Sequence, residues 1–196
     1  MRLPEPTVLG GRHVRLEPLG EQHRANLEAA AAEDPDALRL GALLLTLRGW
    51  DVWYGEAVAG IADRRYVAWA TIEIASGRAV GSTRFADIDV TSERLEIGWT
   101  WLAPSRWRTA VNTEAKLLQL GYAFDQLGAG RVALKTDGRN ARSQAAIERI
   151  GGVREGTLRR HLRMPDGFIR DTVYYSILAD EWAAVRARLE ERLARG

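Results

Sequence analysis

A short loop between a strand and a helix carries the residues best suited to chemistry. Pro104 ends an alternating run of residues, and Arg106 and Arg108 precede an amphipathic segment that begins near Val111. A helix N-terminus presents free backbone N–H groups and the positive end of the helix dipole, so this junction predicts an anion site. The two arginines add full positive charge, which suits a pyrophosphate. By itself the pattern is weak, because most strand–helix loops bind nothing.

Hydrophobic periodicity predicts a mixed α/β fold with one sheet around this junction. Strands are expected around residues 13–19, 66–74, 80–88, 94–102, 131–136, 153–162 and 169–178. Helices are expected at 21–32, in parts of 40–65, at 111–127, around 146–150 and over the last fifteen or so residues. Pro18 ends the first strand, and Gly128 stops the long helix. We expect a single domain spanning residues 1–196.

The strand before the loop alternates strongly between apolar and polar residues. Its periodicity places one set on the core face: Leu95, Ile97, Trp99 and Trp101. The opposite face then carries Glu96, Gly98 and Thr100. A carboxylate in the middle of a strand is therefore expected close to the candidate anion site.

The composition excludes several kinds of chemistry. The 196 residues include no cysteine, which rules out disulfides, thiolate nucleophiles and cysteine-based zinc sites. His13, His23 and His161 lack the spacing of a metal-binding pair, so we expect no metal. The formal net charge is +2, and 26 of the 28 basic residues are scattered arginines, which argues against a nucleic-acid partner.

No targeting or membrane signal stands out in the sequence. The N-terminal stretch has no long apolar segment of the kind found in secretory signals, and the apolar residues 41–47 are too few to span a bilayer. We therefore expect a cytoplasmic protein without a membrane partner. A homodimer is compatible with the sequence.

Five motifs in order resemble the GNAT superfamily of N-acetyltransferases, and within it the RimJ/RimL branch that acetylates ribosomal-protein N-termini. They are GRHVRLEPL at 11–19, LEIGWTWL at 95–102, VNTEAKLL at 111–118, KTDGRNARSQAAIERIG at 135–151 and MPDGFIRDTVYYSIL at 164–178. No single motif is decisive, but their order and separations are specific, and they cover nearly the whole chain. The resemblance implies a twisted mixed sheet, splayed near the strand at residues 94–102, with acetyl-CoA lying in the splay.

The resemblance also implies where the cosubstrate binds. Its pyrophosphate would lie on the loop formed by Arg106, Trp107, Arg108, Thr109, Ala110 and Val111, and its pantetheine beside a turn containing Asn140 and Arg142. The chain departs from the family at Arg108, where glycine is usual. Glycine permits unusual dihedrals and close backbone approach, so the Arg108 side chain could pair with phosphate or block the cradle.

The implied reaction is direct attack of a primary amine on the acetyl thioester, without a covalent enzyme intermediate. Glu96 is the candidate base; the alternatives are a solvated glutamate or an ion pair with a nearby arginine. Ser143 is the candidate acid for the leaving thiolate, and its alternative role is a helix N-cap. Tyr174 and Tyr175 are reserve donors for which core packing is favoured.

Other residues keep two interpretations. Asn140 either bonds the pantetheine amides or serves the turn after Gly138, and Arg142 either reaches a phosphate or is solvated. His161 could recognise the acceptor or lie on an exposed hairpin. Trp50 and Trp53 could line an acceptor groove or pack in the core.

Three functions compete on these grounds. The leading hypothesis is an acetyl-CoA-dependent N-acetyltransferase acting on an amine, either a protein N-terminus or a small molecule. The second is a degenerate scaffold of the same fold that binds CoA weakly and serves as a binding or regulatory module, with Arg108 as its support. The third, a basic nucleic-acid-binding module, lacks an aromatic and basic motif.

Overall fold

The computed structural model describes residues 1–38, 40, 49–164 and 166–195. Within them, eight strands form one sheet in the order β1-β2-β3-β4-β5-β6-β8-β7. The strands are β1 (Leu9–Gly10), β2 (Val14–Pro18), β3 (Val67–Glu73), β4 (Arg78–Asp89), β5 (Arg94–Leu102), β6 (Arg131–Asp137), β7 (Val153–Arg163) and β8 (Ile169–Leu178). The α-helices are α1 (Arg24–Ala31), α2 (Pro35–Leu38), α4 (Trp50–Ala62), α5 (Ala110–Gly121), α6 (Ala141–Arg149) and α7 (Trp182–Ala194).

Short helical turns complete the chain. Two 3₁₀ turns, η1 (Glu21–His23) and η2 (Pro104–Arg106), precede α1 and α5, and a π-helical turn, η3 (Tyr122–Gln126), continues α5. Gly128 follows with a φ of 73°, the left-handed conformation that glycine adopts without strain. The helix expected at 111–127 is thus confirmed, with its last turn widened.

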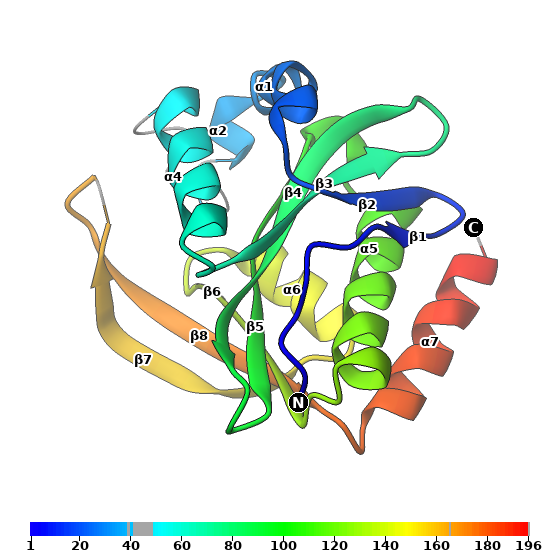
Figure 1. The fold of residues 1–196 in the computed structure, drawn as a ribbon. Helices are drawn as coiled ribbons and strands as arrows, with labels where there is room; N and C mark the ends of the chain where they lie inside the picture. The colour runs from blue at the N-terminus through cyan, green and yellow to red at the C-terminus, as the bar shows by residue number, and fades with distance from the viewer. Residues whose placement is uncertain (39, 41–48, 165, 196) are drawn as a thin grey trace.

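Helices cover both faces of the sheet, as Figure 1 shows. On one face, α5, α6 and α7 pack over a core that includes Phe85, Leu95 and Tyr175. On the other, α1, α2 and α4 pack over a second cluster that includes Trp53 and Trp101. The expected order of elements and the single sheet are both confirmed. The helix expected within 40–65 is confirmed as α4, while the apolar stretch 41–47 lies outside the described residues.

The sheet opens between its two parallel strands. Neighbours are antiparallel throughout except for β5 and β6, and these two pair only at three positions, the last being Glu96 with Ala133. Beyond that pair the strands diverge, and no hydrogen-bonded ladder joins them among the described residues. The expected splay is therefore present, and it begins at Glu96.

The prediction of which face of the sheet each β5 side chain occupies is wrong beyond Gly98. Trp99 has a φ of 48°, and the register with β4 shifts between Ser82 and Arg84, so a β-bulge inserts one extra residue. Trp101 consequently packs with Trp53 on the α4 face instead of sharing a face with Leu95. Strict alternation cannot reveal a bulge, because one inserted residue reverses every later side chain.

Candidate active site

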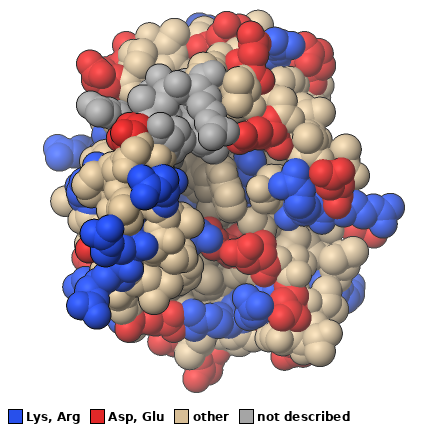
Figure 2. Space-filling model, turned by 90° about the vertical axis from the view of Figure 1, so that its left-hand side faces the viewer, with Lys and Arg blue, Asp and Glu red and all other residues tan. Residues whose placement is uncertain are grey.

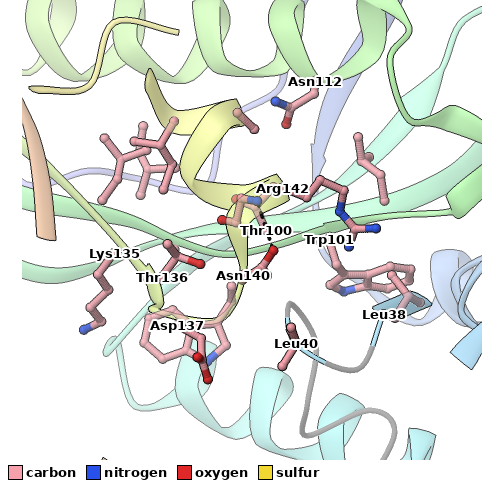
Figure 3. A pocket seen from close by; sticks show the side chains of 18 of the residues that line it. Leu38, Leu40, Thr100, Trp101, Asn112, Lys135, Thr136, Asp137, Asn140 and Arg142 are labelled. Carbon is pink, nitrogen blue, oxygen red and sulfur yellow. Dashed lines mark hydrogen bonds between the residues drawn. The ribbon is translucent and has the colours of Figure 1, made fainter. Parts of the chain in front are cut away.

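The diverging strands border a pocket of about 970 Å³. One side is formed by β5, and the other by β6 and α6; residues of α2, α4, the loop before α5 and the β7–β8 hairpin complete the wall. Figure 2 shows the hollow on this face, with Lys and Arg side chains on both sides of it and acidic side chains at its lower end. In Figure 3, Thr100 and Trp101 enter the pocket from β5, and Lys135, Thr136 and Asp137 follow along β6.

Glu96 lies at the point where the strands part and is only 2% exposed. Burial raises the pKa of Glu96 to about 7, because a buried carboxylate loses its hydration. The ammonium group of Lys135, with Nζ 2.7 Å from Glu96 Oε2, opposes this rise, while Asp87 adds to it. The side chain is thus held in a state from which it can accept a proton near neutral pH.

Two neighbours on β5 shape the space around this carboxylate. A Cβ atom at Gly98 would come 2.7 Å from Glu96 Oε1, so a side chain there would displace the carboxylate. The bulge brings the Trp99 ring over Lys135, with Nζ 5.8 Å from the ring centroid. An ion pair with an arginine was one alternative for Glu96; the partner is instead Lys135, and the solvated alternative is wrong.

The loop before α5 presents Trp107 and Arg108 to the pocket. Arg108 is exposed and has a φ of 61°, the left-handed conformation for which glycine is suited. Its backbone therefore takes the path that the usual family glycine would allow, while its side chain lies at the surface. Trp107 donates its indole N–H to the Leu102 carbonyl at 3.0 Å, which fixes the ring against the end of β5.

Four of the expected loop residues do not line the pocket: Arg106, Thr109, Ala110 and Val111. Arg106 turns towards β3, where its Nε lies 2.7 Å from Glu73 Oε1. Thr109 is the N-cap of α5 and accepts the backbone N–H of Val111 at 3.3 Å. Val111 is buried in the core. The side chains of these residues build the loop, while Trp107 and Arg108 face the pocket.

At the start of α6, Asn140 is the helix N-cap. Its Oδ1 accepts the backbone N–H of Ser143 at 3.0 Å, so the N-cap role considered for Ser143 is wrong. Asn140 and Ser143 both line the pocket. The Asn140 oxygen is committed to the cap, which leaves its amide N–H groups as donors.

Arg142 links three elements across the pocket mouth. Its guanidinium carbon lies 3.3 Å from the centroid of the Trp107 ring, and Nη2 donates to the Ala37 carbonyl at 3.0 Å. Burial lowers the pKa of Arg142 from its usual value. The stack joins α6 to the loop before α5, and the hydrogen bond joins both to α2, so Arg142 is not a freely solvated arginine.

The reserve candidates lie at different depths. Tyr175 is fully buried, as expected, and its hydroxyl donates to Glu148 at 3.3 Å. Tyr174 is half-buried, and its ring centroid lies 6.0 Å from Lys135 Nζ. Trp53 lines the pocket, whereas His161 lies outside it with Nδ1 3.0 Å from Thr172 Oγ1.

Sequence reasoning missed Lys116 and Lys135 as pocket residues. They are the only two lysines among 28 basic residues, and both line the pocket. Their rarity in an arginine-rich chain could have marked them as functional residues. A buried lysine amine can lose its proton, whereas an arginine stays charged. Arg170 and Asp137 were also missed; both lie on strands at the pocket wall.

Comparison with known proteins assigns the family. Residues 13–153 match the family described as the acetyltransferase (GNAT) domain. The chain belongs to the GNAT acetyltransferase family. This family transfers acyl groups from acetyl-CoA, and the resemblance inferred from the five motifs is confirmed. The chain is thus an N-acetyltransferase by family and fold.

Individual relatives agree with this assignment. YdaF of Bacillus subtilis (strain 168), named as a ribosomal N-acetyltransferase, is 33% identical over 132 residues, which cover 66% of this chain and 71% of YdaF. A GCN5-related N-acetyltransferase from Brucella melitensis has a TM-score of 0.85 and 31% identity, covering 97% of this chain and 87% of that one. Mycobacterium smegmatis RimJ, solved with CoA-disulfide, has a TM-score of 0.81 and 21% identity. The match covers 98% of this chain and 97% of the RimJ chain, so the two share the fold.

Neither a membrane span nor a metal site is evident among the described residues. None of the helices found there is both long and apolar enough to cross a membrane. In the same residues, no group of three or more histidine, aspartate or glutamate side chains is arranged to hold a metal ion.

Proposed function

We propose that this GNAT acetyltransferase transfers the acetyl group of acetyl-CoA to a primary amine, with Glu96 as the base. The observation that carries the proposal is the buried Glu96 carboxylate at the start of the splay, in a pocket bordered by arginines. The amine of a protein N-terminus is the favoured acceptor, because YdaF is named as a ribosomal N-acetyltransferase. A small amine is the alternative acceptor.

The pocket suits the shape and charge of the donor. Arg108 and the N-terminus of α5 would attract the pyrophosphate, since a guanidinium favours anions and so do the first-turn helix N–H groups that the Thr109 cap does not use. The Trp107–Arg142 stack borders the same region. From there the unpaired edge of β5 leads to Glu96, so the pantetheine would run along that edge beside Asn140. Arg108 is exposed, which supports pairing with phosphate over blockage of the cradle.

The chemistry follows from these positions. An ammonium ion has no lone pair, so Glu96 would take a proton from the acceptor, directly or through water. The free amine would then attack the thioester carbonyl carbon. Backbone N–H groups of β5 beyond the splay would donate hydrogen bonds to the carbonyl oxygen, which gains negative charge. Ser143 would protonate the leaving thiolate, and the second proton, which the nitrogen loses as the amide forms, would return to Ser143 through water; Tyr174 is the reserve donor.

A titration of acetyl-CoA into the protein by calorimetry tests the donor site. Binding in the micromolar range, followed by acetylation of a peptide amine detected by mass spectrometry, is the expected result. The scaffold alternative expects no binding by the wild-type protein and recovery of binding in Arg108→Gly. Peptides with a free N-terminus, compared with small alkylamines at equal concentration, identify the acceptor class. A protein that binds acetyl-CoA but acetylates neither set would contradict the proposal.

A further inference from the structure

Lys116 is a buried cation whose partners are all neutral. It lies on α5 and is 4% exposed. Its Nζ donates to Thr83 Oγ1 on β4 at 2.9 Å, to Thr100 Oγ1 on β5 at 2.8 Å and to Gln119 Oε1 on α5 at 2.7 Å. Among the described residues, no carboxylate lies within ion-pair distance of this ammonium group.

Such a group is an unusual choice for a structural role. A buried ammonium without a counter-ion is costly, whereas an apolar side chain of similar volume is often tolerated or stabilising. Burial alone lowers the pKa of Lys116 to about 7. The surrounding network is not optimal for stability either, because the Nε2 of Gln119 is buried there without a hydrogen-bond partner in the described structure.

The position of Lys116 relates it to the donor site. Asn112 and Lys116 are four residues apart on α5, and Arg108 precedes the helix by two residues. All three line the pocket, and their burial increases from Arg108, which is exposed, through Asn112, which is half-buried, to Lys116. Figure 3 shows Asn112 and Thr100 on this part of the wall. A series of donors thus leads from the loop to the interior.

We propose that Lys116 supplies a buried positive charge to the donor site, and that the phosphates of bound CoA are its missing counter-charge. This inference rests on the proposed function, since it places the phosphates near the N-terminus of α5. Six residues separate Ala110 from Lys116, which corresponds to about 9 Å along the helix. Lys116 would therefore act on the phosphates through charge and not through contact.

The surroundings of Lys116 define what else could titrate with it. The groups that contact it from β4, β5 and α5 are neutral: Thr83, Thr100 and Gln119. The other charged side chains that line the pocket are Arg108, Arg142, Arg149, Arg163, Arg170, Asp137, Glu96 and Lys135, and the last two are paired with each other. Of these, Glu96 also has a pKa near 7, so it requires its own control.

Calorimetric titration with CoA, which carries no acetyl group and cannot react, provides the test. Measurements at pH 7.5 in buffers of different ionisation enthalpy count the protons taken up on binding. The wild type and Glu96→Gln are expected to take up about half a proton more than Lys116→Met, because the phosphates favour the charged lysine. Lys116→Met should also bind CoA about threefold more weakly at this pH, because the lysine is only partly charged before CoA binds; a fully charged lysine at this separation would give about tenfold.

Stability separates this role from a structural one. The hydroxyl oxygens of Thr83 and Thr100 lie 2.8 Å apart, so these hydroxyls should remain hydrogen-bonded to each other in Lys116→Met. That variant should melt at the wild-type temperature or above it, whereas a lysine kept for stability would lower the melting temperature when replaced. Arg192→Met, an exposed change of equal charge on α7, is the matched control and should leave CoA affinity unchanged.

Each outcome decides the inference. Weaker binding with loss of proton uptake and an intact fold supports it. Wild-type affinity in Lys116→Met overturns it, as does equal proton uptake in the two proteins. If Lys116→Met does not fold, the uptake by Glu96→Gln decides alone, and a value near zero overturns the inference. Failure of the wild type to bind CoA would instead contradict the proposed function.

Discussion

Glu96 and Lys135 form an ion pair, with 2.7 Å between Oε2 and Nζ, across the point where β5 and β6 separate. Glu96 belongs to the last paired position of the two strands, and Lys135 lies two residues beyond Ala133 on β6. The pair therefore spans the beginning of the splay. Because burial and the lysine act in opposite directions, the pKa of Glu96 is about 7 and not far above it.

Replacement of Glu96 by glutamine tests its role as the base. A base must be deprotonated to act, so the wild-type kcat/KM should rise with pH through a midpoint of about 7. Glu96→Gln should lower turnover by about 10²- to 10⁴-fold and remove this midpoint. CoA affinity in calorimetry should remain within about twofold. A wild-type rate and pH profile in the variant would remove Glu96 from the mechanism.

Replacement of Lys135 by methionine should move the same midpoint to higher pH. The ammonium group stabilises the charged carboxylate, so its loss raises the pKa of Glu96 further above its ordinary value. At pH 7 the rate should fall several-fold, and it should recover in more alkaline buffer. The pH dependence of kcat/KM measures the shift. A midpoint that stays in place, or moves to lower pH, would show that Lys135 does not control this titration.

The sequence predicted the location of Glu96 but not its partner. Side chains alternate between the two faces of a strand, and this alternation can be read from the local sequence. Leu95 and Ile97 lie in the core, so Glu96 lies on the opposite face, as expected. Its pairing with Lys135 depends on the parallel crossover from β5 to β6, residues 103–130, which no local pattern encodes. Likewise, Arg106 was expected at the anion site because of its position in the loop, and Glu73, distant in the sequence, draws it towards β3.

The bulge in β5 is a second feature that could not be predicted from the sequence. Glycine is the usual indicator of a positive φ, and here Trp99 adopts that conformation directly after Gly98. Tertiary contacts compensate for the strain, because the Trp99 ring lies close to both Lys135 and Arg84. Arg108 likewise has a positive φ without being glycine. Trp99 and Arg108 line the pocket, whereas the other described non-glycine residues with a positive φ do not: Arg64, Asp87, Glu93 and Arg160.

Arg108→Gly should distinguish the effect of the loop's backbone conformation on stability from the effect of its charge on CoA binding. Glycine adopts a φ of 61° without strain, so the variant should be more stable by about 1 kcal/mol in denaturant unfolding. The lost guanidinium should weaken CoA binding about three- to tenfold and reduce its dependence on salt concentration. Arg192→Gly would not serve as a control, since glycine destabilises a helix; Arg192→Met is suitable. Tighter CoA binding by Arg108→Gly would indicate that the arginine obstructs the cradle.

Glu114 provides a test of the scaffold that leaves the pocket intact. Its carboxylate accepts three backbone N–H groups before and at the start of β2: Arg12 at 2.9 Å, His13 at 2.6 Å and Val14 at 2.7 Å. The carboxylate lies so close to Gly11 that a Cβ atom there would be 2.5 Å away. One glutamate of α5 thus holds the N-terminal segment against the helix.

Glu114→Ala should therefore destabilise the protein by about 2–4 kcal/mol, because one buried and two partly buried N–H groups lose a charged acceptor. For a chain of this size the melting temperature should fall by roughly 5–15 °C. Glu191→Ala, an exposed change of equal charge on α7, should alter it by no more than about 2 °C. CoA affinity measured below the melting transition should be unchanged, since Glu114 does not line the pocket. Equal melting temperatures in the two variants would show that the carboxylate does not anchor β2.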